Sequence, residues 1–228
     1  MNFNLDYWIN TKDYTPATLI WNGIGCLFWL VTYAAMVRSI IKNKFVEMPF
    51  VVAAGNIAWE FVWSFCVHPT TGKFYAMSYQ GCFFLDVYIF AMMFKYGHKQ
   101  IEIPVIKKYF KLILVGLAII WLPLNYFYVM QGYDTPVGAN SGYILSLFIS
   151  LLYPMLLLRN QVTNFSPVVA WCKFIGTGCV TVSMFLMYPT NYFVQILGGA
   201  CFFLDCGFAI MLSKKLKEQK NETSRVPA

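Results

Sequence analysis

Hydrophobic residues occur in long stretches along this chain, and polar residues gather in the short segments between them. A helix needs about 20 mostly apolar residues to cross a lipid bilayer. Seven stretches meet or approach that length: residues 17–37, 49–67, 76–94, 109–129, 141–158, 167–187 and 192–213. The pattern predicts an all-α membrane protein in which residues 1–228 form a single domain of seven transmembrane helices.

The composition agrees with lipid as the main solvent of this chain. Of its 228 residues, 59% are hydrophobic and 12% are charged, whereas about 25% are charged in an ordinary soluble domain. All 7 cysteines fall within the predicted helices. This placement favours free thiols over a disulfide framework or a zinc site.

Basic residues flank alternate ends of the predicted helices and account for the net charge of +7 without a nucleic-acid partner. Of the 17 lysines and arginines, 15 fall on one side: Arg38, Lys42, Lys44, Lys95, Lys99, Lys107, Lys108, Lys111, Arg159, Lys173, Lys214, Lys215, Lys217, Lys220 and Arg225. Lys12 and Lys73 fall on the other side. The positive-inside rule then places the N-terminus outside or in a lumen and the tail, residues 214–228, in the cytoplasm. This charged tail is expected to be loosely ordered.

An internal repeat is visible in the segment CFFLD, which occurs at residues 82–86 and again at 201–205. Short proline- and threonine-containing loops precede both copies. The pattern predicts two three-helix units, about residues 17–96 and 141–213, joined by a linker helix at about 109–129. In such a 3+1+3 arrangement the units are parallel repeats related by an axis along the membrane normal, and a site is expected between them.

Three acidic residues, Glu60, Asp86 and Asp205, lie deep within predicted spans. A charged group at the bilayer centre costs about 2.5 to 3.5 kcal/mol, so such residues are candidates for function. The alternative is a carboxyl group that only forms a hydrogen bond between packed helices. Counting along the helices places the three acids roughly 10, 15 and 20 Å below the lumenal end. We therefore expect them to line one cavity at graded depth.

Aromatic and small side chains share helical faces with these acids. The candidate substrate-binding residues are Asn56, Trp63 and Ser64 beside Glu60, Tyr79 and Phe83 beside Asp86, and Phe202 and Phe208 beside Asp205. Burial favours the protonated form of a carboxyl group, as general-acid chemistry requires, and aromatic ring faces stabilise cations. A proton donor in a dry aromatic cavity suits the carbocation cyclisation of a polyene taken from the bilayer, and it would also suit a proton-coupled carrier.

At NIAWEFVWSF (residues 56–65) and at the late FFLD (202–205), the sequence resembles a known family. These are the integral-membrane terpene cyclases of fungal meroterpenoid and indole-diterpene biosynthesis, the paxilline-type cyclases. The resemblance covers nearly the whole chain and implies protonation of an epoxide, or sometimes an alkene, on a prenylated aromatic or indole compound. It implies Glu60 and Asp205 as the catalytic pair. Asp86 matches no family motif, and a supporting role for it depends on the repeat.

The resemblance also implies a place in secondary metabolism. We expect an upstream prenyltransferase and an epoxidase to supply the substrate, and a location in the endoplasmic reticulum. The chain has no Asp-Asp-x-x-Asp cluster of the kind that binds magnesium and diphosphate. We therefore expect no metal and no cofactor, and a protonation-initiated reaction of the isomerase or lyase type.

Two other classes of membrane protein compete with this interpretation. The main alternative is a small transporter of the 3+1+3 type, in which the buried acids bind substrate or protons. A carrier needs openings on both faces, whereas a cyclase needs a pocket closed to the water that quenches cations. A seven-helix receptor is disfavoured, because the connecting segments are short and the last helix has no internal lysine for a retinal link.

Overall fold

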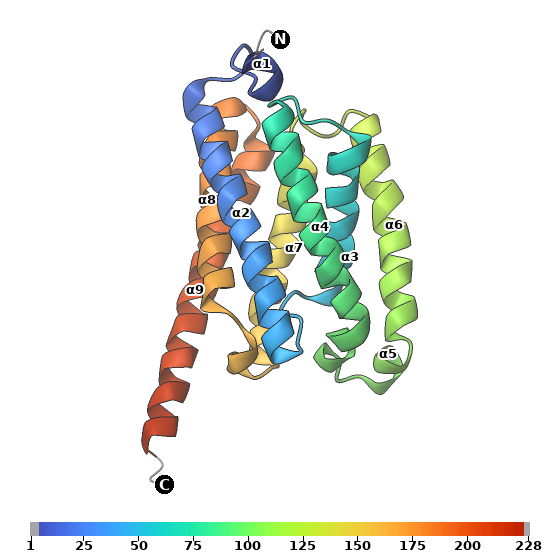
Figure 1. The fold of residues 1–228 in the computed structure, drawn as a ribbon, viewed down its shortest axis with the longest axis vertical. Coiled ribbons are helices and arrows are strands. Elements are labelled where there is room, and N and C mark those ends of the chain that lie inside the picture. The colour runs from blue at the N-terminus through green and yellow to red at the C-terminus, as the bar shows by residue number, and fades with distance from the viewer. Residues whose placement is uncertain (1–4, 226–228) are drawn as a thin grey trace.

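Helices and short loops make up the computed structural model, which describes residues 5–225 of the chain (Figure 1). In chain order the elements are α1 (Leu5–Trp8), α2 (Pro16–Asn43), α3 (Phe50–Phe61), the π-helical η1 (Val62–Cys66), α4 (Lys73–Tyr96), the 3₁₀ turn η2 (Gly97–Gln100), α5 (Pro104–Lys108), α6 (Phe110–Met130), α7 (Ala139–Leu158), the 3₁₀ turn η3 (Val162–Asn164), α8 (Pro167–Met187) and α9 (Tyr192–Arg225). No β-strand occurs within residues 5–225, which confirms the predicted all-α class.

Each predicted hydrophobic stretch contains a helix, and within the described residues 6 helices are long and apolar enough to cross a membrane: α2, α4, α6, α7, α8 and α9. The second predicted stretch forms a shorter apolar helix, Phe50–Cys66. Large apolar side chains are exposed on the outside of the bundle, including Leu112 at 70% and Phe203 at 75%. All seven cysteines are free thiols, as predicted. These features are those of a membrane protein, whose outer surface faces lipid.

Local sequence signals set the ends of α2. The hydroxyl group of Thr15 accepts a hydrogen bond from the backbone N–H of Thr18 at 3.4 Å, and Pro16 follows at the first helical position, where its missing N–H is harmless. At the other end Lys44 adopts a left-handed conformation with φ 52°. Its N–H still donates to the carbonyl oxygen of Ile40 at 2.9 Å. The chain therefore turns sharply at Lys44 and re-enters the bundle as α3.

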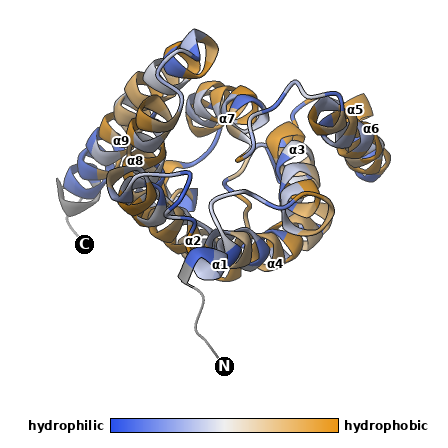
Figure 2. Ribbon diagram, turned by 90° about the horizontal axis from the view of Figure 1, so that it is seen from above, coloured by the Kyte–Doolittle hydropathy of each residue, from blue (hydrophilic) through white to orange (hydrophobic). Residues whose placement is uncertain are grey.

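Six helices form a closed ring (Figure 2). On one side α4 packs against both α2 and α3, and on the other α9 packs against both α7 and α8. Contacts of α2 with α8 and of α3 with α7 close the ring. Helix α6, the predicted linker, packs against α3 on the outside. The order around the ring is therefore α2, α4, α3, α7, α9, α8, which places α3 opposite α8.

Small residues bring α2 and α8 into close contact. A Cβ atom added at Gly25 would lie 2.5 Å from the Cγ2 atom of Val180 and 3.1 Å from the carbonyl oxygen of Gly176. Backbones approach this closely only where side chains are absent, and this mode of packing is common between membrane helices. The contact fixes one seam of the ring, next to the cavity described below.

The C-terminal tail corrects one expectation. Residues 214–225 were predicted to be loosely ordered, but they continue α9 as a helix that extends beyond the bundle (Figure 1). The sequence SKKLKEQK is rich in good helix formers, and a helix that is already formed in the bundle propagates without a new nucleation step. Residues 226–228 of the predicted tail lie outside the described residues.

Candidate active site

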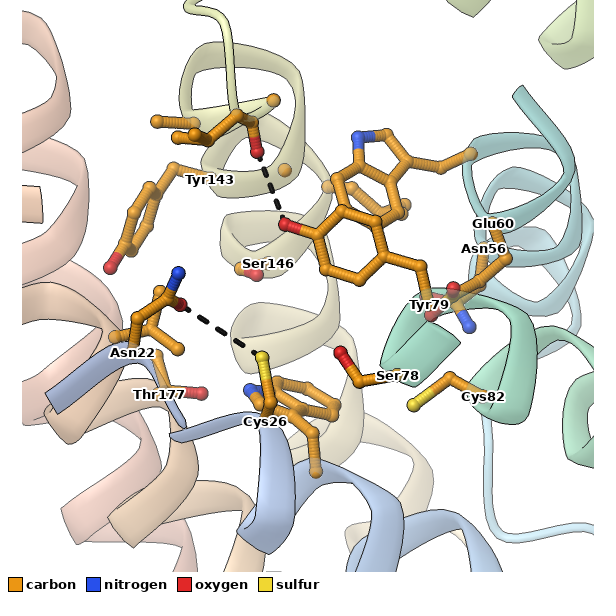
Figure 3. Close-up of a pocket in the computed structure, with 18 of the residues that line it drawn as sticks. Asn22, Cys26, Asn56, Glu60, Ser78, Tyr79, Cys82, Tyr143, Ser146 and Thr177 are labelled. Atoms are coloured by element: carbon orange, nitrogen blue, oxygen red, sulfur yellow. Dashed lines mark hydrogen bonds between the residues drawn. The ribbon is translucent and has the colours of Figure 1, made fainter. Parts of the chain in front are cut away.

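A cavity lies inside the six-helix ring (Figure 3). It holds about 850 Å³ of space free of protein atoms, including its open mouth. Its walls come from α2, α3, α4, α7, α8 and the loop before α7. Five aromatic residues line it: Trp29, Tyr33, Trp59, Tyr79 and Tyr143. The site is therefore central in the bundle, and aromatic rings form a large part of its wall.

Glu60 on α3 lies in the wall of this cavity with its side chain buried. The hydroxyl group of Tyr33 donates to its Oε1 atom at 3.2 Å, and Asn56 Nδ2 donates to the same hydroxyl group. The Oε2 atom of Glu60 is buried and has no hydrogen-bond partner among the described residues. Two neighbours thus orient the carboxyl group and leave one of its oxygens free.

Asp86 on α4 is completely buried behind this group. Neither of its carboxyl oxygens has a hydrogen-bond partner in the described part of the chain. Asn56 and Tyr33, which both line the cavity, are polar neighbours of Asp86. Asp86 is not among the cavity-lining residues, so its contact with the site runs through Asn56 and Tyr33.

Asp205 on α9 forms a buried ion pair with Lys173 of α8. The hydroxyl group of Ser150 donates to Asp205 Oδ1 at 2.6 Å, and Lys173 Nζ lies 3.1 Å from that hydroxyl oxygen. The rings of Trp29 and Tyr153 lie 5.9 and 6.0 Å from Nζ. Asp205 does not line the cavity. Of the three acids that were expected to line one cavity, Glu60 does so, and Asp86 and Asp205 do not.

Lys173 itself corrects the sequence interpretation. It was grouped with the basic residues that flank helix ends, but it lies inside α8 with a side chain only 2% exposed. A lysine near the start of an apolar helix is indistinguishable, in sequence, from one that reaches the membrane surface. The partner that makes its burial possible, Asp205, comes from another helix, and breaking such a pair by removing one member is strongly destabilising.

The three predicted neighbours of Glu60 differ in whether they line the cavity, and the difference falls at the start of the π-helical segment. Asn56 lines the cavity with Glu60, but Trp63 and Ser64 are buried and are not among the lining residues. Trp63 packs behind Trp59, with ring centroids 6.0 Å apart. The face was assigned by α-helical spacing, whereas Val62–Cys66 follows the wider i→i+5 pattern. This turn rotates Trp63 and Ser64 away from the position that α-helical spacing predicts.

The other four predicted substrate-binding residues lie in different parts of the structure, and one of them lines the cavity. Tyr79 lines the cavity, and its hydroxyl group donates to the carbonyl oxygen of Val137 at 3.2 Å. Phe83 joins an outer aromatic group and packs 5.0 Å from Phe65, which is 44% exposed. Phe202 is itself 39% exposed, and Phe208 packs in the core against Tyr153 at 5.4 Å. Phe83, Phe202 and Phe208 are not among the cavity-lining residues, because lipid-facing and cavity-facing surfaces are both apolar and sequence does not separate them.

Sequence reasoning missed the contribution of α2 to the site. Asn22, Cys26, Trp29 and Tyr33 all line the cavity. Their spacing of four, three and four residues places them on one helical face. This stripe of polar and aromatic residues in the first hydrophobic stretch was a usable signal. Thr177 of α8, in contrast, had no comparable mark in the sequence.

The loop before α7 fixes the rim of the cavity. Asp134 Oδ1 accepts the backbone N–H groups of Thr135 and Asn140 at 2.8 and 2.9 Å. The carboxyl group also accepts the hydroxyl group of Ser141. Ser141 in turn accepts the indole N–H of Trp59 at 2.8 Å. Burial raises the pKa of Asp134, and these hydrogen bonds oppose the rise. The loop thereby anchors the indole ring that forms part of the cavity wall.

The fold and the site define an integral membrane protein with a buried acid in an aromatic cavity. The sequence pattern of the Pyr4-like transmembrane terpene cyclases matches residues 12–195, and the chain belongs to this family. It is also similar to the Pyr4-family terpene cyclase mfmH of Annulohypoxylon moriforme, with 23% identity over 175 residues that cover 73% of this chain and 70% of the relative. No solved structure shows a significant match to the chain. The resemblance seen in the sequence is thus confirmed.

Proposed function

We propose that this terpene cyclase protonates an epoxide, or an alkene, of a prenylated lipid-soluble substrate and directs the ring closures that follow. The observation that carries the proposal is the carboxyl group of Glu60, which lies in the wall of an aromatic cavity and keeps its Oε2 atom free of hydrogen bonds within the described residues. Membership in a family of cyclases supports an enzyme over the alternative of a transporter.

Glu60 is the proposed general acid. Its carboxyl group gives a proton to the epoxide oxygen, the bond from that oxygen to the more substituted carbon breaks, and a hydroxyl group and a carbocation result. The electrons of a neighbouring double bond then attack the cationic carbon and close a ring. The final cation loses a proton to a base or to water, and Glu60 regains a proton from solvent. Substrate and product are then isomers.

The residues around Glu60 support each stage of this reaction. Tyr33, by donating to Oε1, stabilises the carboxylate that remains after proton transfer. The rings of Trp29, Trp59 and Tyr79 line the space in which the cation forms. A ring face stabilises a desolvated cation by about 2 kcal/mol or more, and the same rings keep out water that would quench it.

Asp86 and Asp205 are proposed to act without touching the substrate. Asp86 supports the acid through Asn56 and Tyr33. Asp205 matches the second catalytic position of the resembling family, but Lys173 and Ser150 bind its carboxyl group, and none of the three residues lines the cavity. We therefore assign proton delivery to Glu60 and give Asp205 an indirect role, exerted through the charged pair and through Trp29, whose ring lies between Lys173 and the cavity.

We also propose the number and arrangement of the membrane spans, their orientation, and the cellular location of the protein. Seven spans in a 3+1+3 arrangement are supported by the ring, because the third helix of each unit, α4 or α9, packs against the other two. The N-terminus is placed in the lumen of the endoplasmic reticulum and the C-terminus in the cytoplasm. A prenyltransferase and an epoxidase of secondary metabolism supply the substrate, whose head is an aromatic, indole or related group.

The decisive experiment is product identification. Microsomes containing the chain are incubated with a panel of epoxidised prenylated aromatic and indole compounds, and products are identified by mass spectrometry and NMR. Cyclised isomers are expected with the wild type. The matched variant Glu60→Gln keeps the shape of the side chain without an acidic proton, and we expect at least a 100-fold loss of rate. Full activity in Glu60→Gln, at normal expression, would exclude Glu60 as the acid.

A further inference from the structure

The wall of the cavity opposite Glu60 carries a second polar group of residues. Thr177 lies on α8, which faces α3 across the ring, and Asn22 lies on the adjacent α2. Figure 3 shows Asn22 and Thr177 on one side of the cavity and Asn56 and Glu60 on the other. Both side chains line the cavity and are at most 3% exposed. The site therefore has polar groups on two opposite sides, and Ser78 and Ser146 lie between them together with aromatic rings (Figure 3).

The hydroxyl group of Thr177 is unusual for a membrane helix. A buried threonine ordinarily bonds to the carbonyl oxygen one turn earlier, and Thr181 and Thr32 do so at 2.7 and 2.8 Å. The Oγ1 atom of Thr177 is buried without any hydrogen-bond partner among the described residues. An unpaired buried hydroxyl group costs about 1 to 3 kcal/mol. A ligand that bonds to this atom removes that cost.

Asn22 is also poorly engaged by the protein. Its Oδ1 atom accepts from the thiol group of Cys26 at a distance of 3.9 Å, and a thiol is a weak donor. The amide group therefore retains hydrogen-bonding capacity toward the cavity. Together Asn22 and Thr177 present both donors and acceptors.

The charge of the cavity limits what this end can bind. Glu60 is acidic, and no lysine, arginine or histidine from the described residues lines the cavity. Lys173 lies close by, but its charge is paired with Asp205. A diphosphate or carboxylate would meet no free positive charge here, and an unpaired buried charge is costly. The fitting ligand is uncharged and carries oxygen.

We infer that Asn22 and Thr177 form a head-group subsite that binds a neutral carbonyl or phenolic oxygen of the substrate. This inference rests on the proposed function and adds the polarity of the substrate's head. The subsite anchors the head at α2 and α8 while the epoxide end of the prenyl chain reaches Glu60 on α3. The position of the anchor then fixes which carbon of the chain lies next to the acid.

The test compares two epoxidised substrates with the same prenyl chain, one attached to a phenol and one to an oxygen-free arene. Thr177→Val and Asn22→Leu preserve side-chain size and remove the hydrogen-bonding groups. We expect each variant to lower the ratio of kcat/KM for the phenol to kcat/KM for the arene about tenfold, the value of one hydrogen bond. Thr32→Val, which alters a buried threonine outside the cavity, is the matched control and should leave this ratio as it is in the wild type.

Binding measured without turnover separates this inference from the proposed function. A saturated prenyl phenol and its oxygen-free counterpart, neither of which can cyclise, are titrated into purified protein while the intrinsic tryptophan fluorescence is followed, to which Trp29 and Trp59 in the cavity wall contribute. Tighter binding of the phenol by the wild type, lost in Thr177→Val and Asn22→Leu, supports the subsite even if no cyclised product forms. Equal binding of the two ligands, or equal effects of the variants on both, would overturn it.

Discussion

At the scale of single residues, the hydroxyl group of Tyr33 links Glu60 and Asn56. It donates to Glu60 Oε1 and accepts from Asn56 Nδ2. Because this hydrogen bond is made to Oε1, Oε2 of Glu60 is the carboxyl oxygen that has no hydrogen-bond partner among the described residues. Tyr33 therefore acts as a positioning residue for the proposed acid.

Replacing Tyr33 by Phe removes one oxygen atom and leaves the ring in place. We expect kcat to fall about 10- to 100-fold with little change in KM, because a hydrogen bond to a charged group contributes about 1.5 to 3 kcal/mol. Steady-state kinetics with an accepted substrate measures both constants. Tyr75→Phe is the matched control, since Tyr75 donates to the carbonyl oxygen of Leu19 away from the cavity. A similar loss in both variants would contradict the positioning role.

The ion pair of Lys173 and Asp205 yields a second prediction at this scale. Each single variant, Lys173→Met or Asp205→Asn, leaves a buried charge unpaired and should destabilise the protein by about 3 to 5 kcal/mol. The double variant removes both charges. We expect it to recover thermal stability in detergent and activity to within about tenfold of the wild type. A double variant that is folded but inactive would instead show that Asp205 has a direct catalytic role.

At the scale of elements, the loop between α2 and α3 is held to α8 by a buried acid. Glu47 is 1% exposed, and its Oε2 atom accepts the backbone N–H of Ser166 at 2.9 Å. Burial raises the pKa of Glu47 from 4.5 to about 8, although the hydrogen bond from Ser166 opposes the rise. This burial is not predictable from the hydrophobic pattern, because residue 47 lies between two hydrophobic stretches.

This raised pKa predicts a pH-dependent stability. The unfolded chain loses the Glu47 proton near pH 4.5 and the folded protein near pH 8, so the folded state binds more protons in between and stability falls as pH rises through this window. Glu47→Gln removes the ionisation. We expect similar unfolding temperatures for the variant and the wild type at pH 5, and a higher one for the variant at pH 8. Unfolding curves in detergent that stay parallel across this range would contradict the assignment.

The π-helical segment after Phe61 marks the point along this helix at which the predicted residues stop lining the cavity. Residues before it, Asn56 and Glu60, keep the face that α-helical spacing predicts, and both line the cavity. Residues inside it, Trp63 and Ser64, do not. Such π-helical turns are frequently found at functional sites. Here the turn begins at Val62, two residues after the proposed acid.

At the scale of the whole molecule, the basic residues predict the orientation in the membrane. With Lys173 assigned to the interior, the remaining lysines and arginines of the 15 in the predicted cytoplasmic group flank the end from which α9 extends. Asn164 and Asn221 carry the glycosylation pattern Asn-x-Ser/Thr near this end. Both should remain unmodified in cells, whereas an acceptor site added to the N-terminus should carry sugar. A glycosidase-sensitive mass shift that requires Asn164 or Asn221 would reverse the orientation.

Much of the helix architecture was predictable because hydrophobicity is a local property of the sequence. The seven apolar stretches coincide closely with helices. The family resemblance rests on Glu60, which lies within the matched residues 12–195, and on Asp205, which lies beyond them. The candidate site was less predictable. Phe83 and Phe208 lie on apolar helical faces that resemble those lining the cavity. In a membrane protein an apolar face can contact lipid, a neighbouring helix or a cavity, and the sequence of one helix does not distinguish these cases.

The sequence by itself determined where the helices lie and that Glu60, Asp86 and Asp205 are buried within them, since both follow from the cost of placing polar groups in hydrocarbon. Only the tertiary structure decided which groups meet. It placed Tyr33 on Glu60, Lys173 on Asp205, and Thr177 across the cavity from Glu60. These contacts join residues on different helices, and they depend on the rotation and order of helices around the ring, which packing between side chains sets.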